Sequence, residues 1–130
     1  MHLFPNIVHL NLYYSTGFSD KALNRIAESY PNLKYLNLAK GCYSGLITDK
    51  GLYAIANSCH KLEYLNISNH KEFSEIAIWN VIYSCPKLQE FHIYECKIFY
   101  TTIKEIGLYL KIKYINPSTA TRYLEKIGRD

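Results

Sequence analysis

The chain has 130 residues, of which 48% are hydrophobic and 20% are charged, and its formal net charge is +4 at pH 7. This length and apolar content suit one folded domain with its own core and exclude a disordered chain or a linker. The basic residues are scattered, and no apolar run approaches the roughly 18 residues of a membrane span. We therefore expect neither nucleic acid nor membrane as a partner.

The N-terminal residues and the cysteines indicate a compartment. The start, MHLFPNIVHL, has no basic segment, and Pro5 interrupts it before a signal-peptide core could form. The cysteines show neither CxxC nor zinc spacing, so we expect reduced, mostly buried thiols. We predict a cytoplasmic or nuclear monomer. The four cysteines are Cys42, Cys59, Cys85 and Cys96.

A short apolar motif, LxxLxL, recurs along the chain. Its copies start near residues 7, 33, 62, 88 and 112, which gives offsets of 26, 29, 26 and 24 residues. Its spacing suits a short strand, and the period lies at the long end of the range of about 20–29 residues for leucine-rich repeats. In the fifth copy Pro117 replaces the last apolar residue. The four complete copies are Ile7-Leu10-Leu12, Leu33-Leu36-Leu38, Leu62-Leu65-Ile67 and Leu88-Phe91-Ile93.

A helical stripe follows each strand motif, with apolar residues three, four and seven positions apart. The first three stripes are preceded by a hydroxyl residue and an acid, at Ser19-Asp20, Thr48-Asp49 and Ser74-Glu75. The hydroxyl is expected to cap the helix, and the acid to lie at the positive end of the helix dipole. The stripes are Leu23-Ile26-Ala27-Tyr30, Leu52-Ile55-Ala56-Cys59, Ile78-Val81-Ile82-Cys85 and Ile103-Ile106-Gly107-Leu110.

Stacked strand–turn–helix units predict an α/β leucine-rich-repeat solenoid, with a parallel sheet on the concave face and helices on the convex face. Residues 1–130 are expected to form one such domain of about four to five repeats, closed by a capping helix over 118–130. Because Phe4-Pro5-Asn6-Ile7 repeats the junction Tyr30-Pro31-Asn32-Leu33, the chain starts inside a repeat. We expect a fragment of a longer array; the alternative is a short native chain.

The run CYSGLITDKGLYAIANSCHKLEYLNIS, within residues 42–68, resembles the cysteine-containing leucine-rich repeat. Such repeats occur in F-box/leucine-rich-repeat proteins and in repeat-only proteins similar to the antagonist of mitotic exit, with a ribonuclease-inhibitor-like fold. In F-box members the array receives the substrate of an SCF-type ubiquitin ligase, and a separate F-box binds the Skp1 adaptor. The resemblance therefore implies substrate recognition for ubiquitin transfer.

The chain departs from this family pattern in two respects. No F-box is recognised in it, so contact with Skp1 and cullin is expected only through an F-box absent from this chain. The strand-exit cysteine is kept in two copies, Cys42 and Cys96, while Ser15 and His70 take that place elsewhere. The alternative function is a stand-alone repeat protein that binds and blocks a partner without a ubiquitin role.

Outward-pointing strand positions are the candidate binding residues. Strand residues alternate, so these positions would line the concave face in columns. Aromatic residues with polar groups are favoured at protein interfaces. The predicted protein-binding residues are His9, Asn11, Tyr13, Tyr35, Asn37, Tyr64, Asn66, Glu90, His92, Tyr94 and Tyr114.

Structural explanations compete with binding at these positions. The asparagines could form a ladder of side-chain amides that bond to each other or to backbone across adjacent strands. The tyrosines could simply pack against each other on a solvated sheet. Both alternatives stay open at the level of the sequence.

Catalytic chemistry is poorly supported. His9 and His92 share the expected face, but no nucleophile or carboxylate pair accompanies them. Glu90 and His92 supply only two of the about three or four ligands that a zinc site uses. We therefore expect a protein that is not an enzyme, with no cofactor and no metal.

Overall fold

The computed structural model describes residues 6–41, 46–96, 98, 102 and 104–105, together with the backbone of 114–116. Strands and helices alternate along the chain up to β4. The elements are β1 (His9–Asn11), α1 (Asp20–Ser29), β2 (Tyr35–Asn37), α2 (Asp49–Ser58), β3 (Tyr64–Asn66), α3 (Glu75–Ser84), β4 (Glu90–His92) and β5 (Tyr114–Asn116).

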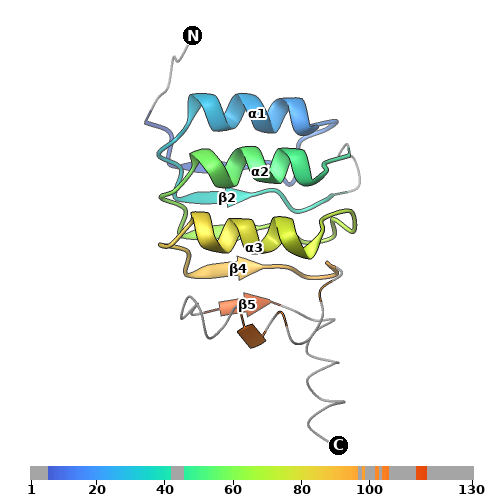
Figure 1. The fold of residues 1–130 in the computed structure, drawn as a ribbon. Coiled ribbons are helices and arrows are strands. Elements are labelled where there is room, and N and C mark those ends of the chain that lie inside the picture. Colours follow the sequence, from blue (N-terminus) through green and yellow to red (C-terminus); the bar gives the residue numbers. More distant parts are fainter. Residues whose placement is uncertain are drawn as a thin grey trace, which may run out of the picture.

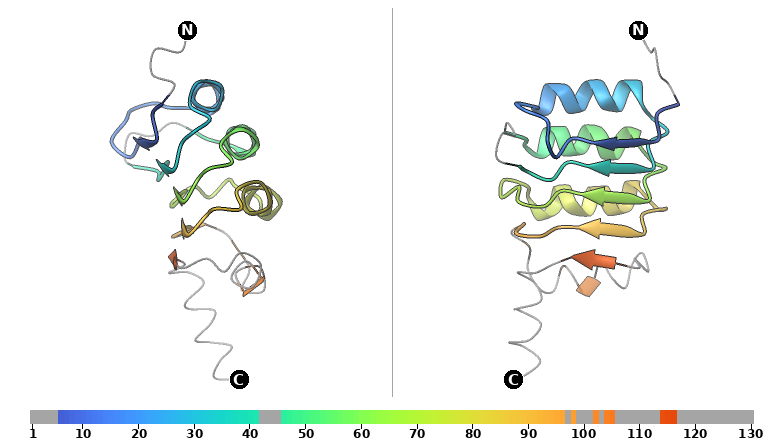
Figure 2. Two further views of the ribbon diagram at one scale, coloured as in Figure 1. Left: turned by 90° about the vertical axis from the view of Figure 1, so that its left-hand side faces the viewer. Right: turned by 180° about the vertical axis from the view of Figure 1, so that it is seen from behind.

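The strands form one parallel sheet in the order β1-β2-β3-β4-β5, so each strand lies beside its neighbour in sequence. The helices α1, α2 and α3 lie side by side along one face of this sheet (Figure 1). Viewed from the end, the helices and strands form two layers (Figure 2). The α/β class and the parallel sheet are therefore confirmed. The sheet face that these helices leave uncovered is called the open face below.

The register places equivalent repeat positions next to each other. Leu10 pairs with Leu36, Leu36 with Leu65, and Leu65 with Phe91. These middle residues of three-residue strands point toward the helices, and Leu36, Leu65 and Phe91 have no exposed surface. Each such side chain contributes about 1.5–3 kcal/mol of burial free energy. The sequence periodicity therefore identified the register of the core correctly.

The helical stripes complete the core. Leu52, Ile55, Ala56 and Cys59 of the second stripe are fully buried, as predicted. Leu10 in the first strand is only partly buried, whereas the equivalent Leu36 is fully buried. Burial in each unit therefore depends on the neighbouring units.

All three helices begin where the sequence predicts, and the predicted hydroxyl cap is present in two of them. The side-chain oxygen of Thr48 accepts a hydrogen bond from the Lys50 amide, and that of Ser74 accepts one from the Ala77 amide. Ser19 precedes α1 with extended backbone, but its side chain makes no capping hydrogen bond. The expected hydroxyl cap at Ser19 is therefore wrong.

Several predictions fall on residues outside the described part of the chain. They are the first residues of the repeat junction at Phe4, the strand-exit Cys42, the whole fourth helical stripe and the capping helix over 118–130. Among the helices that the structure describes, none has the length and apolarity required to cross a bilayer.

Candidate functional site

A ladder of aromatic rings crosses the open face. His9 stacks on Tyr35 with ring centroids 3.9 Å apart and an interplanar angle of 4°. Tyr35 stacks on Tyr64 at 4.1 Å and 10°. The next ring is that of His92, tilted by 40° from Tyr64 at 4.9 Å. We call these four residues the ring ladder; three of its members come from one register column, and His92 comes from the next.

The pairing register of the parallel strands brings the rings of the ladder together. His9, Tyr35 and Tyr64 are paired directly across parallel strands, which lie about 4.8 Å apart. Rings rising from equivalent positions on such strands are held near stacking distance. Glu90 is the β4 member of the same column, and the β5 backbone places Tyr114 next. The Tyr114 side chain lies outside the described residues.

The asparagine column has a local structural role. The Oδ1 atoms of Asn11, Asn37 and Asn66 each accept a hydrogen bond from the backbone amide two residues later, at 2.9, 2.9 and 3.0 Å. Such side-chain turns stabilise the point where the chain leaves the strand. These oxygens therefore do not form the ladder of amides across adjacent strands that was one of the alternatives. Each asparagine bonds within its own strand end.

The repeat also places Tyr13, Ala39, Ser68 and Tyr94 at equivalent positions two residues after the asparagine column, where the sequence predicts a third outward-facing column. This column is only partly on the surface. Tyr13 and Tyr94 have 38% and 39% of their surface exposed, whereas Ala39 and Ser68 between them are buried. Tyr13 also meets Tyr14 edge to face, with ring centroids 4.8 Å apart. The expectation that this whole column points outward is therefore wrong at its centre. Its two tyrosines flank the open face and do not form a continuous row.

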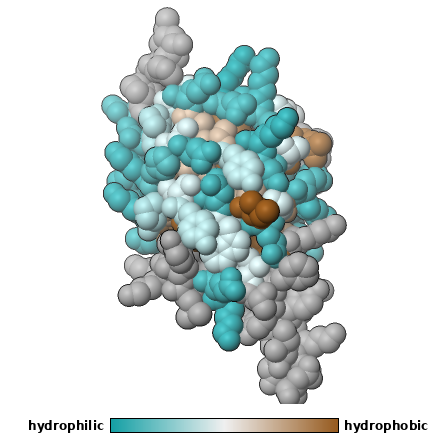
Figure 3. All heavy atoms as spheres, viewed as in Figure 1, coloured by the Kyte–Doolittle hydropathy of each residue, from teal (hydrophilic) through white to brown (hydrophobic). Residues whose placement is uncertain are grey.

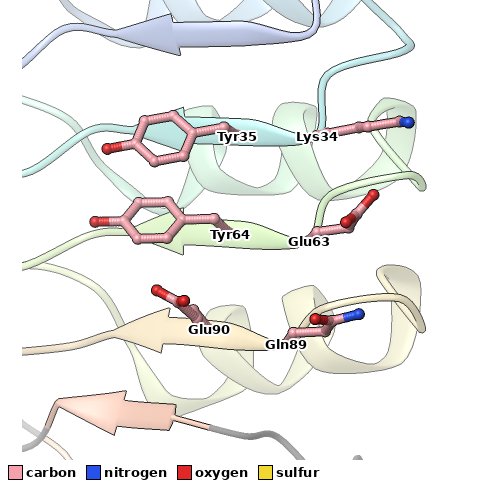
Figure 4. Close-up of a pocket in the computed structure, with 6 residues that line it drawn as sticks. All are labelled: Lys34, Tyr35, Glu63, Tyr64, Gln89 and Glu90. Carbon is pink, nitrogen blue, oxygen red and sulfur yellow. The ribbon is translucent and has the colours of Figure 1, made fainter.

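A shallow hollow of about 360 Å³ lies at the starts of the middle strands (Figure 4). Tyr35 and Tyr64 point the same way on one side of it, with the Glu90 carboxylate turned toward Tyr64. The Nε2 atom of His92 lies 3.4 Å from a carboxylate oxygen of Glu90. The lining residues are Lys34, Tyr35, Glu63, Tyr64, Gln89 and Glu90.

The surroundings of this hollow shift the pKa of the Tyr64 hydroxyl. Partial burial raises the pKa of its hydroxyl, and the charge of Glu90 and the neighbouring Tyr35 act in the same direction. The Asn66 amide donates to the same hydroxyl oxygen at 3.4 Å and opposes the shift. At neutral pH Tyr64 is therefore a neutral phenol that can donate and accept hydrogen bonds.

The cysteines of the described part are core residues. Cys59, Cys85 and Cys96 are buried free thiols, and burial raises their pKa values to about 11, 12 and 12. A nucleophilic cysteine needs a lowered pKa instead. Within the residues that the structure describes, no group of three or more His, Cys, Asp or Glu side chains could hold a metal ion.

Sequence reasoning missed the contacts that join one helix start to the next. The Asp20 carboxylate accepts hydrogen bonds from the Thr48 amide at 2.8 Å, the Thr48 hydroxyl at 2.5 Å and the Gly51 amide at 3.2 Å. Asp49 accepts from the Ser74 amide at 2.9 Å. The acid that follows each hydroxyl residue in the sequence is the signal for these contacts. Its pattern predicts only a favourable position at the positive end of its own helix dipole, and not a bond to the next helix.

Comparison with models of known protein families and with curated proteins found no match. The case for a binding surface therefore comes from this chain's own residues. In the view of Figure 3 the helical side carries mostly hydrophilic and intermediate residues, with strongly hydrophobic residues in a few separate small spots. The open face differs, because it carries an ordered array of aromatic rings.

Proposed function

We propose that this chain is a leucine-rich-repeat module that binds a protein partner on its open face. The strand–helix repeat, stacked in sequence order, supports the solenoid interpretation. The ring ladder carries the proposal of binding. Tyrosines held in place by stacking offer contact area without a large loss of side-chain entropy, which is why interfaces favour them.

The biological role that we propose is substrate recognition for an SCF-type E3 ubiquitin ligase. This follows from the resemblance of the ITDKGLYAIANSC stretch, residues 47–59, to the repeats of F-box proteins. A stand-alone protein that binds and blocks its partner is the alternative. Capture with the full-length gene product distinguishes the two, because only the first should recover Skp1 and cullin.

The size of the surface limits the kind of partner. Five strands at about 4.8 Å spacing span only about 24 Å, whereas a standard interface buries about 800 Å² on each partner. The open face by itself therefore suits a peptide segment of the partner. A larger interface would need loops or further repeats.

Substitution on the open face tests the proposal. Tyr35→Ala, Tyr64→Ala and Tyr94→Ala should each weaken partner capture, and Tyr94→Ala should do so with little loss of stability because Tyr94 is 39% exposed. The matched control is Tyr83→Ala, which removes an exposed tyrosine from α3 on the other side of the molecule. If all three variants capture the partner as well as the control does, the open face is not the binding surface.

A further inference from the structure

A second hollow, of about 440 Å³, lies where three neighbouring repeats leave the sheet. Tyr13 follows β1, Lys40 follows β2 and Asn69 follows β3, so this hollow is at the edge where the strands end. Backbone hydrogen bonds fix two of these positions, because the Lys40 amide donates to the Ser68 carbonyl at 2.9 Å and the Asn69 amide donates to the Tyr94 carbonyl at 2.8 Å. We call it the exit hollow, and we call the hollow of Figure 4 the entry hollow. The exit hollow is lined by Tyr13, Lys40, Gly41, Asn69, Lys71 and Glu72.

The exit hollow is rich in hydrogen-bond donors. Lys40 and Lys71 contribute two ammonium groups, against the single carboxylate of Glu72. Tyr13 adds a phenol and Asn69 adds a side-chain amide, and both groups can donate to an anion. Within the part of the chain that the structure describes, neither lysine forms an ion pair. Both ammonium groups are therefore available to an anionic group of a partner.

The two hollows carry opposite charge at opposite ends of the strands. Lys34, Glu63 and Glu90 give the entry hollow one ammonium group and two carboxylates, the reverse of the exit hollow. Lys40 lies six positions after Lys34, which is about 20 Å in extended chain. Exposed charges are largely screened beyond about 8 Å at physiological ionic strength. The carboxylates of the entry hollow therefore do not cancel the positive charge of the exit hollow.

We propose that the exit hollow binds an acidic side chain, glutamate or aspartate, of the protein partner. The carboxylate accepts charge-assisted hydrogen bonds from Lys40 and Lys71, and the neutral donors of Tyr13 and Asn69 remain for its other lone pairs. The inference rests on the proposed function and gives one contact residue of the partner its chemistry.

Peptides of matched shape test the charge. The full chain, labelled with ¹⁵N, is titrated at low salt with acetyl-Gly-Glu-Gly-amide and with its glutamine counterpart, and NMR follows the binding. We expect the glutamate peptide to shift the amide resonances of Lys40, Gly41 and Asn69 and to bind at least about threefold more tightly than the glutamine peptide. Equal binding of the two peptides, absence of binding by both, or shifts confined to other residues would overturn the proposal.

A third peptide distinguishes an acidic side chain from a chain terminus as the source of the carboxylate. Acetyl-Gly-Gln-Gly with a free C-terminus carries its only carboxylate at the chain end. We expect it to bind more weakly than the glutamate peptide. Tighter binding of this third peptide contradicts the assignment to an acidic side chain.

Charge-removing variants locate the contact. Lys71→Gln should weaken the glutamate peptide about threefold, and because Lys71 is exposed the variant is expected to fold. Lys34→Gln is the matched control, since it removes an ammonium group from the entry hollow and should have no effect. Glu72→Gln should strengthen binding about twofold, because it removes the carboxylate that lines the exit hollow. Such a gain cannot arise from loss of structure. Equal effects of Lys71→Gln and Lys34→Gln, or weaker binding by Glu72→Gln, contradict the proposal.

The outcomes distinguish failure of this proposal from failure of the proposed function. If the glutamate peptide shows no preference but Tyr35→Ala and Tyr94→Ala still weaken partner capture, the open face is the binding surface and only the acidic contact is wrong. If the glutamate peptide is preferred but partner capture is unchanged in both variants, the proposed function is wrong. If neither effect is observed, both proposals fail together.

Discussion

His70 is a buried histidine that makes the same kind of hydrogen bond as Cys96, which holds the equivalent position in the next repeat. Its Nε2 atom donates to the Leu38 carbonyl of the preceding strand at 2.5 Å, just as the thiol of Cys96 donates to the Ile67 carbonyl at 3.2 Å. The other ring nitrogen, Nδ1, is buried without a hydrogen-bond partner in the described part of the chain. A neutral imidazole with its proton on Nε2 therefore suits this buried position. A charged ring would carry a second proton on Nδ1, where no acceptor lies in the described part of the chain.

Burial lowers the pKa of His70, and the charge of nearby Lys40 adds to this effect, while the Leu38 carbonyl and Glu72 oppose it. As pH falls below the unfolded value of about 6.5, the unfolded chain gains this proton before the native chain does. Stability should therefore be fully present above pH 7 and decline as pH falls, by up to about 1.4 kcal/mol per pH unit.

The substitution His70→Cys tests this pH dependence. A thiol can keep the hydrogen bond to the Leu38 carbonyl and does not become protonated in acid. Urea unfolding at pH 7.5 and pH 5.5 should show a smaller loss of stability for the variant than for the native chain. The same loss in both proteins would mean that other groups cause the acid sensitivity.

Gly51 is a glycine because α1 passes close to the start of α2. An added Cβ would lie 2.4 Å from the Asp20 Oδ1 atom and 2.8 Å from a methyl carbon of Leu23. Gly51→Ala should therefore destabilise the fold by about 1–3 kcal/mol, although alanine is the better helix former. Thermal unfolding measures this loss. Lys50→Ala, at the exposed neighbouring position, should change stability little; stabilisation by Gly51→Ala would show that the helices can separate at low cost.

At the scale of the elements, a series of carboxylates ties each helix start to the next. Asp20 bonds to Thr48, Asp49 to Ser74, and the Glu75 carboxylate accepts from the Thr102 hydroxyl at 2.9 Å. Asp20 and Asp49 therefore satisfy donors at the start of the following helix, and Glu75 satisfies a donor 27 residues later in the chain. These bonds help to set the alignment of neighbouring helices, which apolar packing alone specifies less strictly.

Asp20→Asn is the sharpest test of these ties, because Asp20 accepts three hydrogen bonds from the start of α2. Bonds to a charged acceptor contribute about 1.5–3 kcal/mol, so the variant should lose stability in that range. Glu28→Gln, on the exposed side of the same helix, is the control. A double-mutant cycle with Thr48→Val should give a coupling energy of about 0.5–3 kcal/mol. Strict additivity would show that the two side chains act independently.

For the whole molecule, each repeat is buried by its neighbours. Leu65 in β3 has no exposed surface, whereas Leu10 at the corresponding place in β1 is partly buried. Leu65→Ala should cost about 2–5 kcal/mol and lower the midpoint of one cooperative transition. Leu10→Ala should cost less, and chemical denaturation compares the two. Equal losses would indicate that the first strand is covered as completely as the third.

Much of the fold could be predicted from the sequence. The spacing of Leu33, Leu36 and Leu38, repeated at intervals of 24–29 residues, was sufficient to predict the strands and a register that pairs Tyr35 with Tyr64. The separate spacing of three, four and seven residues predicted the helices. Period and alternation are local properties, so the buried columns follow from them directly. The same alignment placed Cys59 and Cys85 in the core.

The tertiary structure decided what the polar residues do. Three polar contacts depend on distances between repeats: whether Asn37 bonds across the sheet or to its own backbone, whether Asp20 bonds within its own helix or to the next one, and how the Tyr64 ring meets that of His92. The sequence determined by itself which columns exist, because burial follows periodicity. Only the packed repeats decided which polar partners lie in a neighbouring unit, because such a hydrogen bond or ring contact requires atoms from two units at a fixed separation.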